Sequence, residues 1–105
     1  MTRVDTHAPA VRPVAGETFR RIAARRIEGN KRRKVAALIA AYQDAGQPTC
    51  NAPELAERLG WKPIQVQGLL SRLEADGLVE CATKRKGKWP RFRVVLDGDA
   101  RGGRR

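Results

Sequence analysis

Three glycines divide the middle of this 105-residue chain into short stretches with helical periodicity: Gly46, Gly60 and Gly77. Glycine adopts positive φ at little cost, so it commonly follows the last residue of a helix. Before each of these glycines, apolar residues recur at spacings of three and four, as on a helix with one buried face. The pattern predicts three consecutive helices, over residues 31–45, 52–59 and 62–76.

The starts of these helices carry local signals. Asn30 is predicted to cap the first helix by accepting a hydrogen bond from an unpaired N–H. Asn51 and Glu54 have the spacing of a capping box at the start of the second helix. Pro53 and Pro63 lie in first turns, where a helix needs no N–H donor.

The apolar stripes of the three helices define the predicted core. It comprises Val35, Leu38, Ile39 and Tyr42, then Leu55, Ala56 and Leu59, then Val66, Leu69, Leu70 and Leu73. Trp61, between the second and third helices, is predicted to join this core rather than to stack on a ligand. Leu78 is predicted to fold back onto Leu73 in a Schellman cap at Gly77.

Two stretches with strand composition follow, LVECAT at 78–83 and RFRVVL at 91–96. In the second, Phe92, Val94 and Leu96 alternate with the other residues, which predicts a strand with these three side chains inward. Together the stretches predict a β-hairpin whose tip and return strand carry the basic segment 84–93. Thr49 and Cys50 are predicted to form a short additional strand.

The net charge of +11 is unevenly distributed. Residues 1–34 hold ten Lys or Arg and three acids, residues 35–83 hold three and six, and residues 84–105 hold nine and two. Two basic segments around a slightly acidic middle are typical of a nucleic-acid-binding protein. The chain lacks a signal peptide and an apolar run of the roughly 18 residues that a membrane span needs, so we expect a cytoplasmic protein and no membrane partner.

The basic ends are predicted to differ in structure. Residues 1–16 contain two prolines and no periodicity and are predicted to be a disordered arm, and residues 98–105 a Gly/Arg-rich tail. Residues 17–30 are predicted to form a basic amphipathic helix, over 17–28, and a linker. That helix could pack on the domain, pair with its copy in a dimer, or lie on nucleic acid.

Catalysis and metal binding find no support in the sequence. The one histidine, His7, lies in the predicted arm, and no nucleophile triad, paired-carboxylate motif or phosphate-binding glycine loop is present. His7, Cys50 and Cys81 lack the spacing of metal ligands, so both cysteines are expected to be free thiols. We expect a protein that is not an enzyme and has no cofactor, metal or small-molecule ligand.

The order of helix, short strand, helix, turn, helix and hairpin resembles the winged helix-turn-helix family, in particular small MarR-like and phage-type regulators. NAPELAERLGWKPIQVQGLLSRLEADGLV, residues 51–79, carries the resemblance, and residues 31–97 are its extent. Ala56 matches the small residue of the motif, Gly60 its turn glycine, and Val66 and Leu69 its inner apolar positions. The implied fold class is α+β, with a three-helix core, a β-hairpin wing, an extra N-terminal helix and basic tails.

The resemblance implies that helix 62–76 enters the major groove of DNA and that the wing, 84–93, contacts the backbone or minor groove. The implied helix contacts are Lys62, Pro63, Ile64, Gln65, Gln67, Gly68, Ser71 and Arg72. The implied wing contacts are Lys84, Arg85, Lys86, Lys88, Trp89, Arg91 and Arg93, and Arg32 and Arg33 add charge.

The helix residues suggest different roles. Gln65 and Gln67 could each bind adenine through two hydrogen bonds, or could be ordinary helix surface. Gly68 would let the helix backbone approach DNA closely, and Ile64 could contact a thymine methyl group. Lys62 suits a phosphate, as does Ser71.

We therefore expect a duplex-DNA-binding protein, either a transcriptional regulator or a nucleoid-associated protein, acting as a homodimer. Because most cations lie in the tails and wing, backbone contacts should dominate and affinity should fall steeply with salt. One alternative is an RNA- or ribosome-associated winged helix that uses the same cations. Another is a protein-interaction module that docks a partner through the acidic middle: Glu54, Glu57, Glu74, Asp76 and Glu80.

Overall fold

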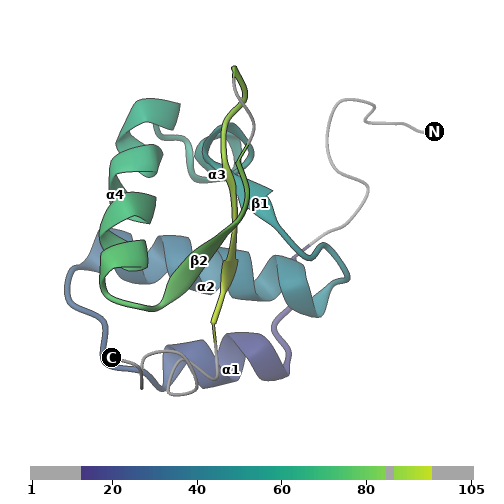
Figure 1. The fold of residues 1–105 in the computed structure, drawn as a ribbon. Coiled ribbons are helices and arrows are strands. Elements are labelled where there is room, and N and C mark those ends of the chain that lie inside the picture. The colour runs from purple at the N-terminus through teal and green to yellow at the C-terminus, as the bar shows by residue number, and fades with distance from the viewer. Residues whose placement is uncertain (1–12, 85–86, 96–105) are drawn as a thin grey trace.

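The computed structural model of the protein describes residues 13–84 and 87–95. Within these ranges the chain is α+β, as the sequence predicts, with four helices and one antiparallel three-stranded sheet (Figure 1). The elements are α1 (Glu17–Ala23), α2 (Asn30–Asp44), β1 (Cys50–Asn51), α3 (Ala52–Leu59), α4 (Pro63–Ala75), β2 (Val79–Thr83) and β3 (Arg91–Val94). None of the helices in this part of the chain is long and apolar enough to cross a membrane.

Helix α2 lies at the centre of the molecule. It packs against α1 on one side and against α4 and the sheet on the other (Figure 1). Val35 and Ile39 are fully buried, as their spacing predicts, and Ala36 and Ala40 are buried as well. Small alanine side chains let two layers approach the same helix closely, which explains why this helix is so rich in alanine.

Helix α1 is shorter than the predicted helix over 17–28, because it ends at Ala23. On a regular helix, Ile22 and Ile27 would point about 140° apart, since each residue turns the helix by about 100°. Ending the helix allows both side chains to reach one core, where Ile22 is 1% exposed and Ile27 is 4% exposed. The apolar side of residues 17–30 thus packs inside its own chain, in the same core as the later helices.

A carboxylate from the far end of α2 caps the start of α1. Asp44 accepts hydrogen bonds from the backbone N–H of Thr18 at 2.9 Å and of Phe19 at 2.8 Å. Gly16 lies so close that a Cβ there would be 2.8 Å from the Asp44 Cγ. The N–H of Val14 donates to the carbonyl of Ala41, so residues 13–16, the last of the predicted disordered arm, lie against α2.

The predicted cap at Asn30 is wrong. Asn30 is itself the first residue of α2, and Gly29 precedes it with φ of 90° and no side-chain cap. The Gly29 carbonyl accepts the N–H of Arg33 at 3.0 Å. Because glycine tolerates this positive φ, the chain enters the helix one residue earlier than a side-chain cap would require.

The boundaries of α3 and α4 confirm the local signals. The Asn51 side chain accepts the Glu54 N–H at 3.0 Å, and the Glu54 carboxylate accepts the Asn51 N–H at 3.1 Å. Gly60 follows α3 in a left-handed conformation. Helix α4 begins at Pro63 and ends at Ala75, one residue before the predicted end, and the Leu78 N–H donates to Leu73 at 3.0 Å, as the Schellman motif requires.

The sheet has the order β1-β3-β2, so the return strand of the hairpin is central. Phe92 pairs with Cys50 on one side and with Cys81 on the other. Phe92 and Val94 are buried, as their alternation predicts. The short strand at Cys50 is confirmed, and so is the hairpin. Leu96 lies outside the described residues, as do residues 1–12 of the arm and the tail 98–105.

Candidate nucleic-acid interface

One long face of α4 is open to solvent. Val66, Leu70 and Leu73 bury the opposite side of the helix. The exposed positions include Lys62 at the N-cap, then Pro63, Ile64, Gly68, Ser71 and Arg72, all of which the sequence assigns to the outer face. Ile64 is 72% exposed, an unusual environment for such a large apolar side chain.

Gly68 lies on this open face. A Cβ added there would meet no atom within 4 Å, so no contact within the described structure explains why the residue is glycine. Glycine inside a helix costs about 0.5–1 kcal/mol relative to alanine. The missing side chain leaves the backbone of α4 accessible to a large ligand.

The two glutamines lie at the edges of the open face rather than at its centre. Both Gln65 and Gln67 are half-buried. The Oε1 atom of Gln67 is buried and lacks a hydrogen-bond partner among the described residues. A buried oxygen without a partner costs roughly 1–3 kcal/mol, so a rotation that brings this amide to a hydrogen-bond donor would be favourable.

The cations of the hairpin segment fall into two groups. Lys84 and Lys88 are exposed, and the neighbouring Trp89 is 40% exposed. Arg93 is also exposed but pairs with Glu80 on the adjacent strand. Arg85 and Lys86 lie outside the described residues.

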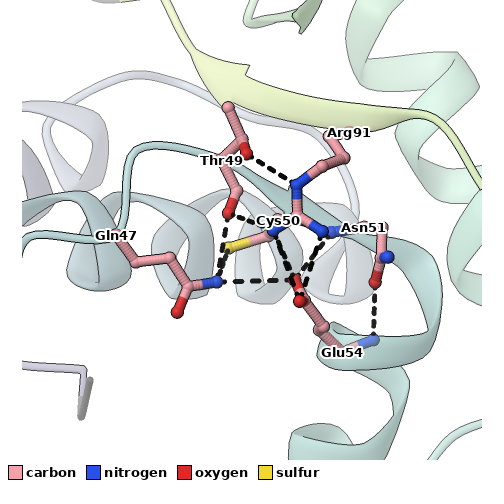
Figure 2. Close-up of polar contacts among 6 residues, drawn as sticks. All are labelled: Gln47, Thr49, Cys50, Asn51, Glu54 and Arg91. Atoms are coloured by element: carbon pink, nitrogen blue, oxygen red, sulfur yellow. Dashed lines mark hydrogen bonds and ion pairs between the residues drawn. The ribbon is translucent and has the colours of Figure 1, made fainter. Parts of the chain in front are cut away.

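Arg91 is turned toward its own chain, although its place in the basic segment predicts that it faces the ligand. Its Nε donates to the Thr49 hydroxyl at 2.7 Å, and its Nη2 donates to the Thr49 carbonyl at 2.9 Å and to Glu54 Oε1 at 3.0 Å. Figure 2 shows the guanidinium held between these two residues. Arg91 therefore joins the start of β3, at the loop end of the hairpin, to the start of α3.

The same cluster extends into the core. The Gln47 amide donates to the Thr49 carbonyl at 3.0 Å and lies 3.4 Å from Glu54 Oε1 (Figure 2). Cys50, between them in the sequence, is fully buried and free, as expected of this thiol. Burial, followed by the nearby Glu54 carboxylate, raises the pKa of Cys50 to about 12, despite the opposing effect of Arg91. The cluster is a structural anchor, and its thiol is neutral at physiological pH.

The start of α2 flanks α4. Arg32 is half-buried and its Nη1 lies 2.9 Å from the Asp76 carboxylate, just after α4. The Arg33 guanidinium donates to the Ile27 carbonyl at 3.3 Å. The Lys31 ammonium lies 5.7 Å from the centre of the Trp61 ring, which packs partly against the core as predicted. Arg32 therefore connects two helices, while Lys31 and Arg33 keep their exposure.

The first turn of α4 and the far end of the hairpin lie at the same end of the molecule, beside α3 (Figure 1). This end carries the exposed Lys62, Pro63 and Ile64 at the start of α4 and the exposed Lys84 and Lys88 of the hairpin segment. Such a surface can insert a helix into a groove and bind phosphates on its rim. No group of three His, Cys, Asp or Glu side chains that could hold a metal occurs in residues 13–84 and 87–95.

The sequence does not single out two of the arginines. Arg58 is exposed in the last turn of α3, and its only signal in the sequence was its position outside the apolar stripe. The internal pairing of Arg91 had no local signal, because its partner Glu54 is 37 residues away. Comparisons with protein-family models, curated proteins and solved structures found no match to this chain.

Proposed function

We propose that this protein is a winged-helix protein that binds duplex DNA, with α4 in the major groove and the β2–β3 hairpin as the wing. The observation that carries the proposal is the open face of α4, which includes Gly68, on a helix whose first turn lies at the same end of the molecule as the end of the hairpin. A backbone without side chains at the centre of that face suits close contact with bases, and cations at its edge suit phosphates.

Within this proposal the polar residues divide by role. Lys84, Lys88 and Lys62 neutralise phosphates, while Ile64 and Ser71 lie against the groove. Gln67 gains a partner for its buried oxygen if its amide rotates toward a base. Arg91 acts indirectly, since its bonds to Glu54 and Thr49 hold the hairpin in position against α3. The biological role is transcriptional regulation or chromosome organisation, carried out by a homodimer.

The RNA alternative uses the same cations but a different groove. The major groove of an A-form RNA helix is too deep and narrow to admit α4, so the face around Gly68 would be unused. The docking of a protein on the acidic middle is a weaker alternative, because three of its carboxylates are engaged with arginines of the same chain: Glu54, Asp76 and Glu80. The open face of α4 favours duplex DNA over both.

The test is a titration of the protein with a random-sequence duplex and with a structured RNA of equal length, at several salt concentrations. Each phosphate contact contributes a slope of about −0.9 to log K against log [salt]. We expect Lys84→Ala with Lys88→Ala to reduce the slope by about 2, and the matched pair Lys84→Arg with Lys88→Arg to leave it unchanged. Tighter binding to RNA, or an unchanged slope in the alanine variant, would contradict the proposal.

A further inference from the structure

A second basic surface lies on α1, the linker after it and the first turn of α2. Six of its exposed cations are here called the α1–α2 basic surface: Arg20, Arg21, Arg26, Lys31, Arg33 and Lys34. Only two acids, Glu17 and Glu28, occur in the segment 17–34. This surface carries more exposed cations than the described part of the hairpin segment, where Arg91 and Arg93 pair with acids.

The fold holds these cations outward. Ile22 and Ile27 bury the apolar side of the segment in the core, and Asp44 caps the start of α1. The positive side chains consequently have only the solvent side available. A surface fixed in this way loses little conformational entropy when it binds, unlike a charged tail.

Among the described residues, few carboxylates pair with this positive charge. Arg21 lies 3.7 Å from Glu17, and both side chains are exposed, so that pair is weak. Within residues 13–84 and 87–95, no carboxylate lies within 4.0 Å of the cationic groups of Arg20, Arg26 or Lys34. An uncompensated cluster rich in arginine matches a phosphate backbone, because guanidinium groups bind phosphate oxygens through two parallel hydrogen bonds.

The position of α1 separates this surface from the proposed wing. In Figure 1, α1 lies at one end of the molecule, and the end of the hairpin and the first turn of α4 lie at the other. A straight duplex seated against α4 and the hairpin therefore leaves α1 facing away from it. The cations of α1 are thus directed to another side than the hairpin lysines, whereas Lys31, at the start of α2, lies beside Trp61 and close to α4.

We propose that the α1–α2 basic surface binds the phosphate backbone of a second segment of duplex DNA, so that the protein bridges two duplexes. The proposal rests on the proposed function for the first duplex and adds a sequence-independent contact for the second. The second contact involves no groove reading, because the apolar side of α1 is covered by its own core and its exposed cations, Arg20 and Arg21, are long side chains suited to phosphates.

The experiment is a capture assay with the full chain: one duplex is fixed to beads and a second, fluorescent duplex is added with protein. The test variant is Arg20→Ala, Arg26→Ala and Lys34→Ala, and its charge-conserving control is Arg20→Lys and Arg26→Lys. We expect the test variant to capture at least about tenfold less second duplex, with a salt slope for capture smaller by about 3. The control should capture as wild type does. Thermal melting should show that both variants fold, since all three side chains are exposed.

Binding of the wild-type protein to the fixed duplex is measured in the same wells. Retention on the fixed duplex without capture of the second would overturn bridging and leave the proposed function standing. Undiminished capture by the test variant would also overturn it, because the bridge would then come from elsewhere, such as from a dimer. Absence of wild-type protein from the fixed duplex would instead contradict the proposed function itself. If the test variant lost retention on the fixed duplex and capture of the second duplex equally, a single surface would bind both duplexes. That result would refute the two-surface proposal.

Discussion

Arg91 on β3 and Glu54 on α3 lie 3.0 Å apart between Nη2 and Oε1, and the same carboxylate caps its own helix. Both side chains are about one-third exposed. This pair ties the hairpin to the helix that leads into α4, so it sets how the two parts of the candidate interface are oriented. The local sequence predicts that Arg91 contacts the ligand. In the structure, Arg91 instead stabilises the surface proposed to bind that ligand.

Two substitutions of Glu54 test its two roles, as part of the cap of α3 and as the ion-pair partner of Arg91. Glu54→Ala removes the capping bond and the partner of Arg91, and we expect a loss of about 2 kcal/mol in the free energy of unfolding. Glu54→Gln keeps an acceptor for the Asn51 N–H but loses the charge, so its loss should be smaller, about 1 kcal/mol. Urea denaturation checks both, with the exposed Glu74→Ala as control. Equal effects of Glu54→Ala and Glu74→Ala would show that the cluster has no structural role.

The cap formed by Asp44 predicts a dependence on pH. Burial alone would raise the pKa of Asp44, but hydrogen bonds from Phe19 and Thr18 outweigh it and lower the pKa below 3.8. The folded state therefore favours the carboxylate, and this contribution is present above about pH 4 and is lost as the pH falls through the lowered value.

We expect Asp44→Asn to be less stable than wild type by about 1 kcal/mol at pH 7, and the difference to shrink as the pH falls below about 4. Urea midpoints across this range measure the effect. Amide hydrogen exchange at Thr18 and Phe19 should quicken in the variant. A difference between the two proteins that stays constant with pH would exclude the charged cap.

A substitution at Gly68 should change the stability of the fold and the affinity for DNA in opposite directions. Because a Cβ at this position meets no atom within 4 Å, Gly68→Ala should stabilise the fold by about 0.5–1 kcal/mol. If the backbone of α4 approaches DNA here, the same change should weaken duplex binding by about tenfold, or about 1.4 kcal/mol. A raised melting temperature with unchanged affinity would place the DNA elsewhere.

The two cysteines should differ in reactivity. Cys50 is buried with its pKa raised to about 12, whereas Cys81 is partly exposed on β2. At pH 8 a thiol reagent should modify Cys81 rapidly and Cys50 only as fast as the protein unfolds. In urea both should react at similar rates. Rapid modification of Cys50 in the native protein would contradict its place in the core.

The parts of the fold that the sequence predicts best are those with local causes. The capping box of Asn51 and Glu54 and the glycines at positions 60 and 77 act within a few residues, so the bounds of α3 and α4 differ from their predictions by no more than one residue. The exposed face of α4 likewise follows from a regular period and the burial of Val66 and Leu70.

The features that the sequence did not reveal depend on distant residues. Asp44 reaches the start of α1 across 26 residues, and Arg91 reaches Glu54 across 37. The early end of α1 arises because Ile27 finds room in a core built mostly by later helices. No local pattern shows which arginines are used in such contacts, so Arg91 and Arg32 could not be told apart from cations that face outward.

The most direct measurement of the central claim is a map of amide chemical shifts in the labelled protein during titration with duplex DNA. A duplex of about 20 base pairs is long enough to span one proposed site with free ends. The predicted result is that the largest changes occur at Ile64, Gly68 and Ser71 on α4 and at Lys84 and Lys88 in the hairpin segment. Changes confined to other helices, or no changes at near-physiological salt, would contradict the proposal that α4 and the hairpin bind duplex DNA.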